Sequence, residues 1–413
     1  MPPAAPSASK SQVPFVAAIV TAEVLGMLGI SSFAGLLPEF ARLWHLSATE
    51  AGWISGLYYA GYVAAVPVLT ALTDRIDPRR IYLASTALGG IANLGFALTA
   101  HGFWSAVGWQ VLSGLGLAGT YMPGLKALTD RVAGPHQSRA LASYTSGFSV
   151  GIGGSFMIAG ALGMPYGWRW AFFVPAATSA LAFLIASLAL KPIPAQSHAR
   201  PQTRLLDFRP VLTNRAAMGY VVGYGFHVWE LFGVRSWVVA FLAFSVTLQP
   251  PGSAHWSPTL IATLLTLLGV VFSISGNELC LRFGRRRTLP LLMLSSCIAA
   301  CGIGFTAPWN NALVSCLCLF YGGLVMVDSS SLTAGLVEVA TPGYRGATMA
   351  VYSSIGFMGA FLGPIVFGTM LDRAGGPSHV ASWGLAFASL GIAVGCGALA
   401  LVILRPRDAS GPA

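Results

Sequence analysis

Apolar residues run almost without interruption through twelve stretches of the chain, and polar residues gather in the short intervals between them. Each stretch provides roughly the 20 apolar residues that an α-helix needs to cross a bilayer. None shows the alternation of apolar and polar positions expected of a transmembrane β-strand. The pattern therefore predicts twelve membrane-spanning helices near residues 13–37, 50–73, 80–100, 104–127, 140–163, 170–190, 216–246, 256–279, 288–306, 310–337, 346–371 and 379–404.

Composition supports a membrane protein. Of the 413 residues, 55% are apolar and 9% are charged, whereas soluble proteins carry about 25% charged residues. The intervals between the apolar stretches are too short for a soluble domain of useful size. The first apolar stretch has no small-residue cleavage site, so it is expected to be the first helix and not a removed signal peptide. The predicted fold class is an all-α membrane protein.

The formal net charge of +10 reflects the distribution of cations along the chain. If both termini are cytoplasmic, 19 of the 23 Lys and Arg residues fall in cytoplasmic segments, as the positive-inside rule requires. The basic balance is therefore a topology signal and does not indicate a nucleic-acid partner. It predicts a multi-pass protein of the cell's inner (plasma) membrane with both termini in the cytoplasm.

The two halves of the chain look like copies of one unit. When the sequence is offset by 207 residues, Glu23 falls on Glu230 and Arg75 on Arg282, with no gap needed. Such a repeat predicts two six-helix bundles in parallel orientation. The segment 191–215 between them carries four Pro and five cations and is typical of a cytoplasmic linker. The expected domains are residues 1–190, the linker 191–215, and residues 216–413.

Two loop sequences, TALTDRIDPRR (70–80) and GNELCLRFGRRR (276–287), and one helix start, YGWRWAFF (166–173), form a recognisable set of motifs. This set resembles the major facilitator superfamily of secondary transporters. The stretch TALTDRIDPRR (70–80) is similar to the family's loop motif, although Thr70 and Asp77 replace its two glycines. The second copy, GNELCLRFGRRR (276–287), has Leu281 in place of the motif's Asp, and YGWRWAFF (166–173) resembles the family's start of helix 6. The resemblance implies twelve helices in two pseudo-symmetric bundles and a transporter, not an enzyme.

In that family the loop motif acts as a cytoplasmic latch between the halves. An Asp there faces a helix N-terminus of the other half, and its arginines bind carboxylates or carbonyls. The alternative is that these arginines only set the orientation in the membrane. The gate predicted here consists of Asp74, Arg75, Arg79, Arg80, Arg282 and Arg286.

Several short motifs resemble catalytic sites but lie inside predicted helices. GLGLAG (114–119) matches a dinucleotide fingerprint and GFSVG (147–151) a hydrolase elbow, yet both motifs require a preceding strand. We interpret these glycines, and those of GAFLG (359–363) and GIAVG (391–395), as close helix packing. The six cysteines lie in or at the ends of predicted helices, and we expect no metal and no cofactor.

Three carboxylates lie well inside predicted helices: Glu23, Glu230 and Asp328. Each costs about 2.5 to 3.5 kcal/mol at the centre of a membrane helix, which is hard to retain without a function. The resemblance implies that helices 1, 4, 7 and 10 line the central cavity, and the three acids fall on helices 1, 7 and 10 of this set. Because Glu23 and Glu230 occupy equivalent positions in the two halves, they are expected to face each other across the cavity. Because burial disfavours the charged form of a carboxyl group, these residues are predicted proton-coupling sites. The alternative is a structural ion pair or hydrogen-bonded helix contact.

The stretch FHVWELFGVRSW (226–237) concentrates polar groups on predicted helix 7. His227 and Glu230 share a helix face, whereas Arg235 lies about 140° away from Glu230. Arg235 is therefore expected to meet another helix or an anionic group of the substrate, the alternative being an anchor near the outer interface. The predicted substrate cavity contains His227, Arg235, Tyr121 and Trp229.

These patterns predict a proton-coupled symporter that moves a small organic solute by alternating access. One alternative is proton antiport that exports cationic or amphipathic compounds. A second, from another class, is a membrane sensor that binds but does not transport. The expected partners are a small-molecule substrate, protons and membrane lipid, with no nucleic acid, and the protein is expected to be a monomer.

Overall fold

The computed structural model describes residues 12–73, 75–132, 136–192 and 208–404, and all regular secondary structure in these ranges is helical. The helices are α1 (Gln12–Met27), α2 (Ser32–Gly35), α3 (Leu37–Leu43), α4 (Ala48–Leu72), α5 (Pro78–Thr99), α6 (Phe103–Thr129), α7 (His136–Ile158), the π-helical turn η1 (Ala159–Gly163), α8 (Met164–Tyr166), α9 (Trp170–Ala189), α10 (Arg209–Leu212), α11 (Arg215–Thr247), α12 (Pro258–Phe283), α13 (Arg285–Ile303), the 3-10 turn η2 (Gly304–Thr306), α14 (Asn311–Met326), α15 (Ser329–Val339), α16 (Arg345–Arg373) and α17 (Val380–Ile403).

Ten helical segments of the described chain are long and apolar enough to cross a membrane. The two remaining predicted spans correspond to α6 and to α1 with α2. The all-helical membrane fold predicted from the apolar pattern is therefore confirmed. The first span is interrupted after α1, and the backbone N–H of Ser31 donates to the hydroxyl of Ser155 at 2.9 Å. This bond satisfies a backbone group that the break would otherwise leave unpaired in the membrane.

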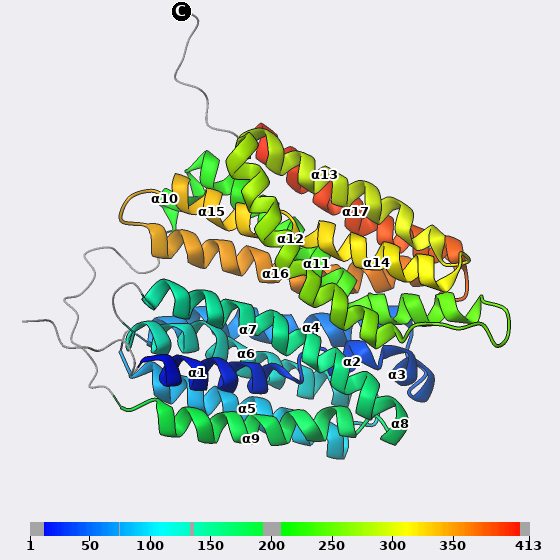
Figure 1. Ribbon diagram of the computed structural model, residues 1–413, viewed down its shortest axis with the longest axis horizontal. Coiled ribbons are helices and arrows are strands. Elements are labelled where there is room, and N and C mark those ends of the chain that lie inside the picture. The colour runs from blue at the N-terminus through cyan, green and yellow to red at the C-terminus, as the bar shows by residue number, and fades with distance from the viewer. Residues whose placement is uncertain (1–11, 74, 133–135, 193–207, 405–413) are drawn as a thin grey trace, which may run out of the picture.

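Helices from the two halves of the sequence lie on two sides of the molecule (Figure 1). Helices α1 to α9 pack mainly with one another, as do α11 to α17, and the sides meet where α4 contacts α16 and α7 contacts α12. Helix α9 ends and α11 begins at one end of the molecule, on the left of Figure 1. We call this the linker end, and the opposite end the far end.

The two sides are joined by hydrogen bonds at the far end. The carboxylate of Asp372, at the end of α16, accepts from the backbone N–H groups of Ala48 (3.1 Å) and Thr49 (2.7 Å), the first residues of α4. It also accepts from the Thr49 hydroxyl at 2.6 Å. Between α12 and α7, the Thr263 hydroxyl donates to the carbonyl of Gly153 at 3.1 Å. An acid that caps a helix N-terminus of the opposite half closes this end of the molecule.

The glycine motifs lie at close helix contacts, as predicted. In GLGLAG, Gly114 of α6 faces the backbone carbonyl of Tyr58 in α4, and Gly116 faces Gly89 in α5. In GAFLG, Gly359 of α16 faces the backbone carbonyl of Gly225 in α11. A side chain at these positions would push whole helices apart, so the packing interpretation of the motifs is confirmed.

Replacing Gly114 by Ala is expected to lower the melting temperature of the detergent-purified protein. The new methyl group would overlap a backbone carbonyl of α4 that cannot move alone, a cost of about 1 to 3 kcal/mol. The matched control is Gly108→Ala in the same helix, where nothing lies within 4 Å of an added methyl group. Equal melting temperatures for the two variants would contradict the close α4–α6 contact.

Candidate functional site

Glu230 lies in the interior of the second half and is completely buried. Its carboxylate accepts hydrogen bonds from the Ser296 hydroxyl of α13 (2.9 and 3.0 Å to its two oxygens) and from the Tyr321 hydroxyl of α14 (3.0 Å). The side chain therefore points from α11 toward α13 and α14. The prediction that Glu23 and Glu230 face each other was wrong, because Ser296 and Tyr321 bind the Glu230 side chain within its own half. Repeat symmetry relates the two backbone positions but not the directions of their side chains.

His227 and Asp328 meet one helical turn away from Glu230. The imidazole Nδ1 lies 2.7 Å from Oδ1 of Asp328, and the two side chains are 1% and 2% exposed. This is an ion-pair contact without a well-aligned hydrogen bond. The ring of Tyr224 stacks beside His227, with 5.7 Å between centroids. Two of the predicted proton-coupling acids thus lie with His227 in one buried group, which we call the acid cluster (His227, Glu230 and Asp328).

Asp328 occupies a break in the tenth predicted span, between the end of α14 and the start of α15. The next three residues are serines, whose short polar side chains compete for backbone hydrogen bonds and weaken a helix. Helix α12 supplies their partners: the hydroxyls of Ser273 and Ser330 lie 2.6 Å apart, and Ser331 donates to Asn277 at 3.1 Å. The break therefore places a carboxylate at a point where the helix is locally interrupted.

Glu23 is 1% exposed and lies in the first half, on α1. Within the described residues neither carboxylate oxygen has a hydrogen-bond partner. The side chain faces α7, where a methyl group added at Gly147 would lie 2.9 Å from Oε2. Glu23 is thus a separate buried acid, with no basic partner among these residues and outside the acid cluster.

The predicted cavity residues Tyr121 and Trp229 lie on opposite halves. Tyr121 of α6 packs against Phe148 of α7, with ring centroids 5.0 Å apart. The indole N–H of Trp229, on α11, is buried without a hydrogen-bond partner in the part of the chain that the structure describes. Their participation in substrate binding stays a prediction.

Arg235 lies on α11 and is 5% exposed. Its guanidinium carbon lies 5.3 Å from the ring centroid of Phe232, and it does not pair with Glu230. It lines a small cavity together with Ser31, Ser55 and Gln110 of the first half. Because the residue is buried between the halves, it is not an anchor at the membrane surface, and it meets other helices as predicted.

An aromatic layer joins the halves on the linker side of Arg235. Ring centroids of Tyr59 (α4) and Phe232 (α11) lie 4.4 Å apart, and those of Tyr62 (α4) and Phe357 (α16) lie 4.0 Å apart. No pattern in the sequence indicated this layer, because its members come from three helices far apart in the chain. Together with the Asp372 contacts, the layer closes the far-end part of the interface between the halves.

The predicted gate residues make contacts within their own halves. Arg79 donates to the carbonyls of Leu190 (2.5 Å) and Ser187 (3.2 Å) at the end of α9. The guanidinium carbon of Arg282 lies 5.3 Å from the ring centroid of Phe283. A role for these residues in closing the linker end stays a prediction for another conformation.

The other gate residues are placed as follows. Arg75, Arg80 and Arg286 are exposed, and Asp74 lies outside the described residues. An ion pair that the sequence did not indicate joins Arg131 to Asp77 at 3.2 Å. It holds the end of α6 to the start of α5, so Asp77 has a structural role where the family motif has a glycine.

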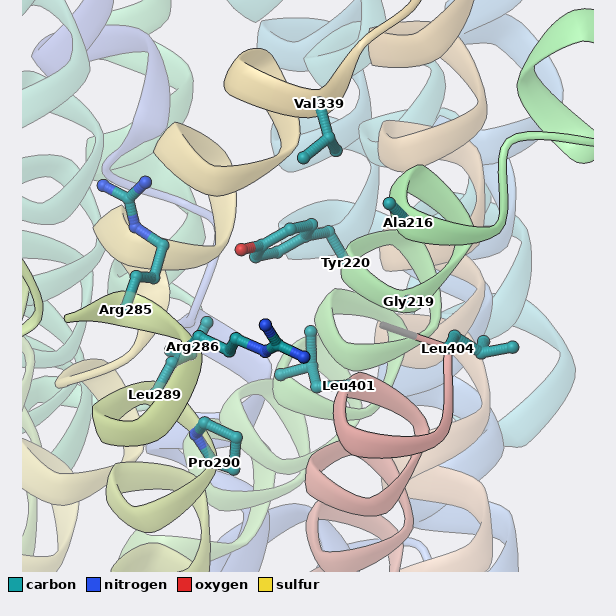
Figure 2. A pocket seen from close by; sticks show the side chains of 10 residues that line it. All are labelled: Ala216, Gly219, Tyr220, Arg285, Arg286, Leu289, Pro290, Val339, Leu401 and Leu404. Carbon is teal, nitrogen blue, oxygen red and sulfur yellow. The ribbon is translucent and has the colours of Figure 1, made fainter. Parts of the chain in front are cut away.

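A cavity of about 160 Å³ lies at the linker end of the second half, between α11, α13, α15 and α17 (Figure 2). Figure 2 shows Tyr220, Arg285 and Arg286 around this space, with Leu289 and Leu401 forming part of its apolar wall. Arg285 is paired with Glu338 of α15, another contact that the sequence did not indicate. None of the buried acids lines this cavity.

Comparison with known proteins identifies the family. Residues 19–364 and 251–413 match the sequence model of a protein family, the Major Facilitator Superfamily. The chain belongs to this superfamily. It is therefore a secondary transporter and a multi-pass membrane protein, and it is not an enzyme.

Two bacterial relatives align with most of this transporter. It is 26% identical over 379 residues to the uncharacterized MFS-type transporter YtbD of Bacillus subtilis, covering 89% of this chain and 91% of that protein. It is 26% identical over 410 residues to the 3-(3-hydroxy-phenyl)propionate transporter of Escherichia coli, covering 95% and 93%.

Two solved structures show the same fold. A mutant form of the nucleoside transporter NupG matches with a TM-score of 0.76 at 14% identity, over 94% of this chain and 99% of that one. A bacterial homolog of the lysosomal transporter Spinster, in an inward-facing and unoccupied conformation, matches with a TM-score of 0.73 at 17% identity, over 96% of both chains. The major facilitator fold of this transporter is thus confirmed.

Proposed function

We propose that this transporter couples the movement of a small organic solute to protons, as a symporter. The observation that carries this proposal is the acid cluster, in which two carboxyl groups and one imidazole are buried together in the second half. We further propose that residues 1–190 and 216–413 move as the two units of alternating access, connected by the linker 191–215.

The charge balance of the cluster supports proton binding. If His227 is protonated and paired with Asp328, Glu230 has no cation of its own, and its partners are two hydroxyl groups. An unpaired carboxylate in a protein interior is costly, so the cluster favours one additional proton. Hydroxyl groups both donate and accept, so Ser296 and Tyr321 can bond Glu230 with or without its proton.

The position of the cluster links protonation to shape. Asp328 lies at the break between α14 and α15, while His227 lies on the continuous helix α11. Protonation of Asp328 removes its attraction to His227 and leaves the break free to move relative to α11. A local charge change at an interrupted helix is a known physical basis for a two-state movement.

The closed far end supports an assignment of this conformation within the transport cycle. We propose that the linker end is cytoplasmic, in agreement with the distribution of cations in the sequence. The conformation closed by Asp372 is then the one that is shut toward the outside of the cell. The Escherichia coli relative, named for transport of an aryl propionate, supports a small organic solute as cargo.

Reconstituted proteoliposomes test this function. With a pH-sensitive dye inside, addition of a transported solute outside is expected to acidify the lumen, because proton and solute enter together. The screen uses organic acids, nucleosides and amines at equal concentration. Solute uptake without any proton movement, or with protons leaving as solute enters, would overturn the symport proposal.

A further inference from the structure

The guanidinium of Arg235 is a buried charge without a counter-ion among the described residues. Its Nε is buried and has no hydrogen-bond partner there, and no Asp or Glu of those residues pairs with it. The nearby acids have other partners, since Asp328 contacts His227 and Glu230 accepts from hydroxyl groups. A buried cation in this situation is costly until an anion joins it.

The first half presents neutral hydrogen-bond donors to this cation. Ser31, Ser55 and Gln110 line the same cavity from three different segments. The hydroxyl of Ser55 is itself buried and without a partner in the described chain. These groups can donate to carboxylate oxygens but cannot neutralise Arg235. One positive charge among several donors is the arrangement that binds a single carboxylate.

Aromatic rings also line the cavity that contains Arg235. Tyr58 and Tyr59 line the cavity, the face of Phe232 lies beside the guanidinium, and Phe33 approaches from α2. Flat apolar faces favour a planar apolar group next to the carboxylate.

The cavity measures about 10 Å³ in this conformation, enough for about one water molecule. Arg235 and Ser236 belong to the second half and the other lining residues to the first. Separation of the halves at the far end therefore widens the cavity, and closure of that end contracts it.

We propose that Arg235, with Ser31, Ser55 and Gln110, forms the recognition site for an organic acid that carries one carboxylate on a planar apolar body. This inference rests on the proposed transport function and names its substrate class. The same positive charge repels amines, so the site selects against the cationic compounds of the antiport alternative. Entry of one carboxylate with one proton makes the transport step electrically neutral.

Binding to the detergent-purified, full-length protein tests the substrate class with three compounds of similar shape: phenylacetate, phenylacetamide and 2-phenylethylamine. Thermal shift and titration calorimetry at one fixed pH are expected to detect phenylacetate alone. Arg235→Gln is expected to weaken phenylacetate binding about tenfold or more, and Arg235→Lys to weaken it less. Arg287→Gln, which removes an exposed arginine of α13 outside the predicted gate, is the control and is expected to bind normally.

Equal binding of the amide or the amine, equal binding by Arg235→Gln and the wild type, or no binding of phenylacetate by the wild type would each overturn the proposal. If the melting temperature of Arg235→Gln without ligand falls sharply, Arg235→Lys is compared with the wild type instead. The binding test uses no pH gradient, so its result does not depend on proton coupling. A negative binding result likewise does not decide the outcome of the proton-flux assay.

Discussion

The double variant Glu230→Gln/Asp328→Asn is expected to lose solute-driven proton movement while still exchanging solute across the membrane. The amide side chains keep the size of the carboxyl groups and part of their hydrogen bonding to Ser296 and Tyr321, but they cannot bind and release a proton. Net uptake driven by a pH gradient is expected to fall about a hundredfold, because the protein must release its proton before it returns empty to the other side. Exchange of labelled for unlabelled solute is expected to persist, because the protein then returns with solute bound and does not need to release a proton.

Controls separate the acid cluster from other carboxylates. Glu278→Gln removes an exposed acid on α12 and is expected to leave uptake unchanged. Glu23→Gln tests the remaining buried acid in the first half, and its effect shows whether that residue shares in coupling. If the double variant still accumulates solute on a pH gradient at the wild-type level, His227, Glu230 and Asp328 form a structural contact and coupling lies elsewhere.

Replacing Asp372 by Ala is expected to shift the protein toward conformations that are open at the far end. The substitution removes the carboxylate that accepts from the first two N–H groups of α4 and from the Thr49 hydroxyl. Loss of such charge-assisted capping costs about 2 kcal/mol, which corresponds to a roughly thirtyfold change in a two-state equilibrium. Within the described residues these bonds join the two halves, so the cost falls on closure more than on folding of either half.

Distances between spin labels at positions 104 and 309 measure this shift. Both positions are exposed and lie at the far end on opposite halves, 104 in the first turn of α6 and 309 in the loop before α14. The labels are attached to cysteines in a background lacking the six native ones. The longer distance is expected to become the main population in Asp372→Ala. Arg373→Ala, at the next and exposed position, is the control. An unchanged distance distribution in Asp372→Ala would show that the far end is held closed by other contacts.

Sequence alone predicted the fold because the membrane imposes a simple rule. Every spanning segment must be apolar and helical, so long apolar stretches mark the helices, and the glycine motifs mark where those helices touch. The same rule made Glu23, Glu230 and Asp328 conspicuous, since ionisable groups are rare in such segments. The placement of His227 and Glu230 on one helix face also followed from helical geometry alone.

The partners of these residues could not be predicted. Ser296 and Tyr321 are ordinary members of apolar helices, and only tertiary packing turns them toward Glu230. Asp372 and Thr49 are 323 positions apart, so no local pattern relates them. The expectation that Glu230 would face Glu23 came from repeat symmetry, which relates backbone positions but does not determine where a side chain points.

The acid cluster is expected to change its protonation during transport. Infrared difference spectroscopy of the purified protein, recorded on addition of a transported solute, observes the carbonyl stretch of protonated carboxyl groups directly. We predict a solute-dependent change in this band that is present in the wild type and in Glu278→Gln and absent in Glu230→Gln/Asp328→Asn. A band that does not respond to solute, or one that persists unchanged in the double variant, would show that the acid cluster does not take up or release protons during transport.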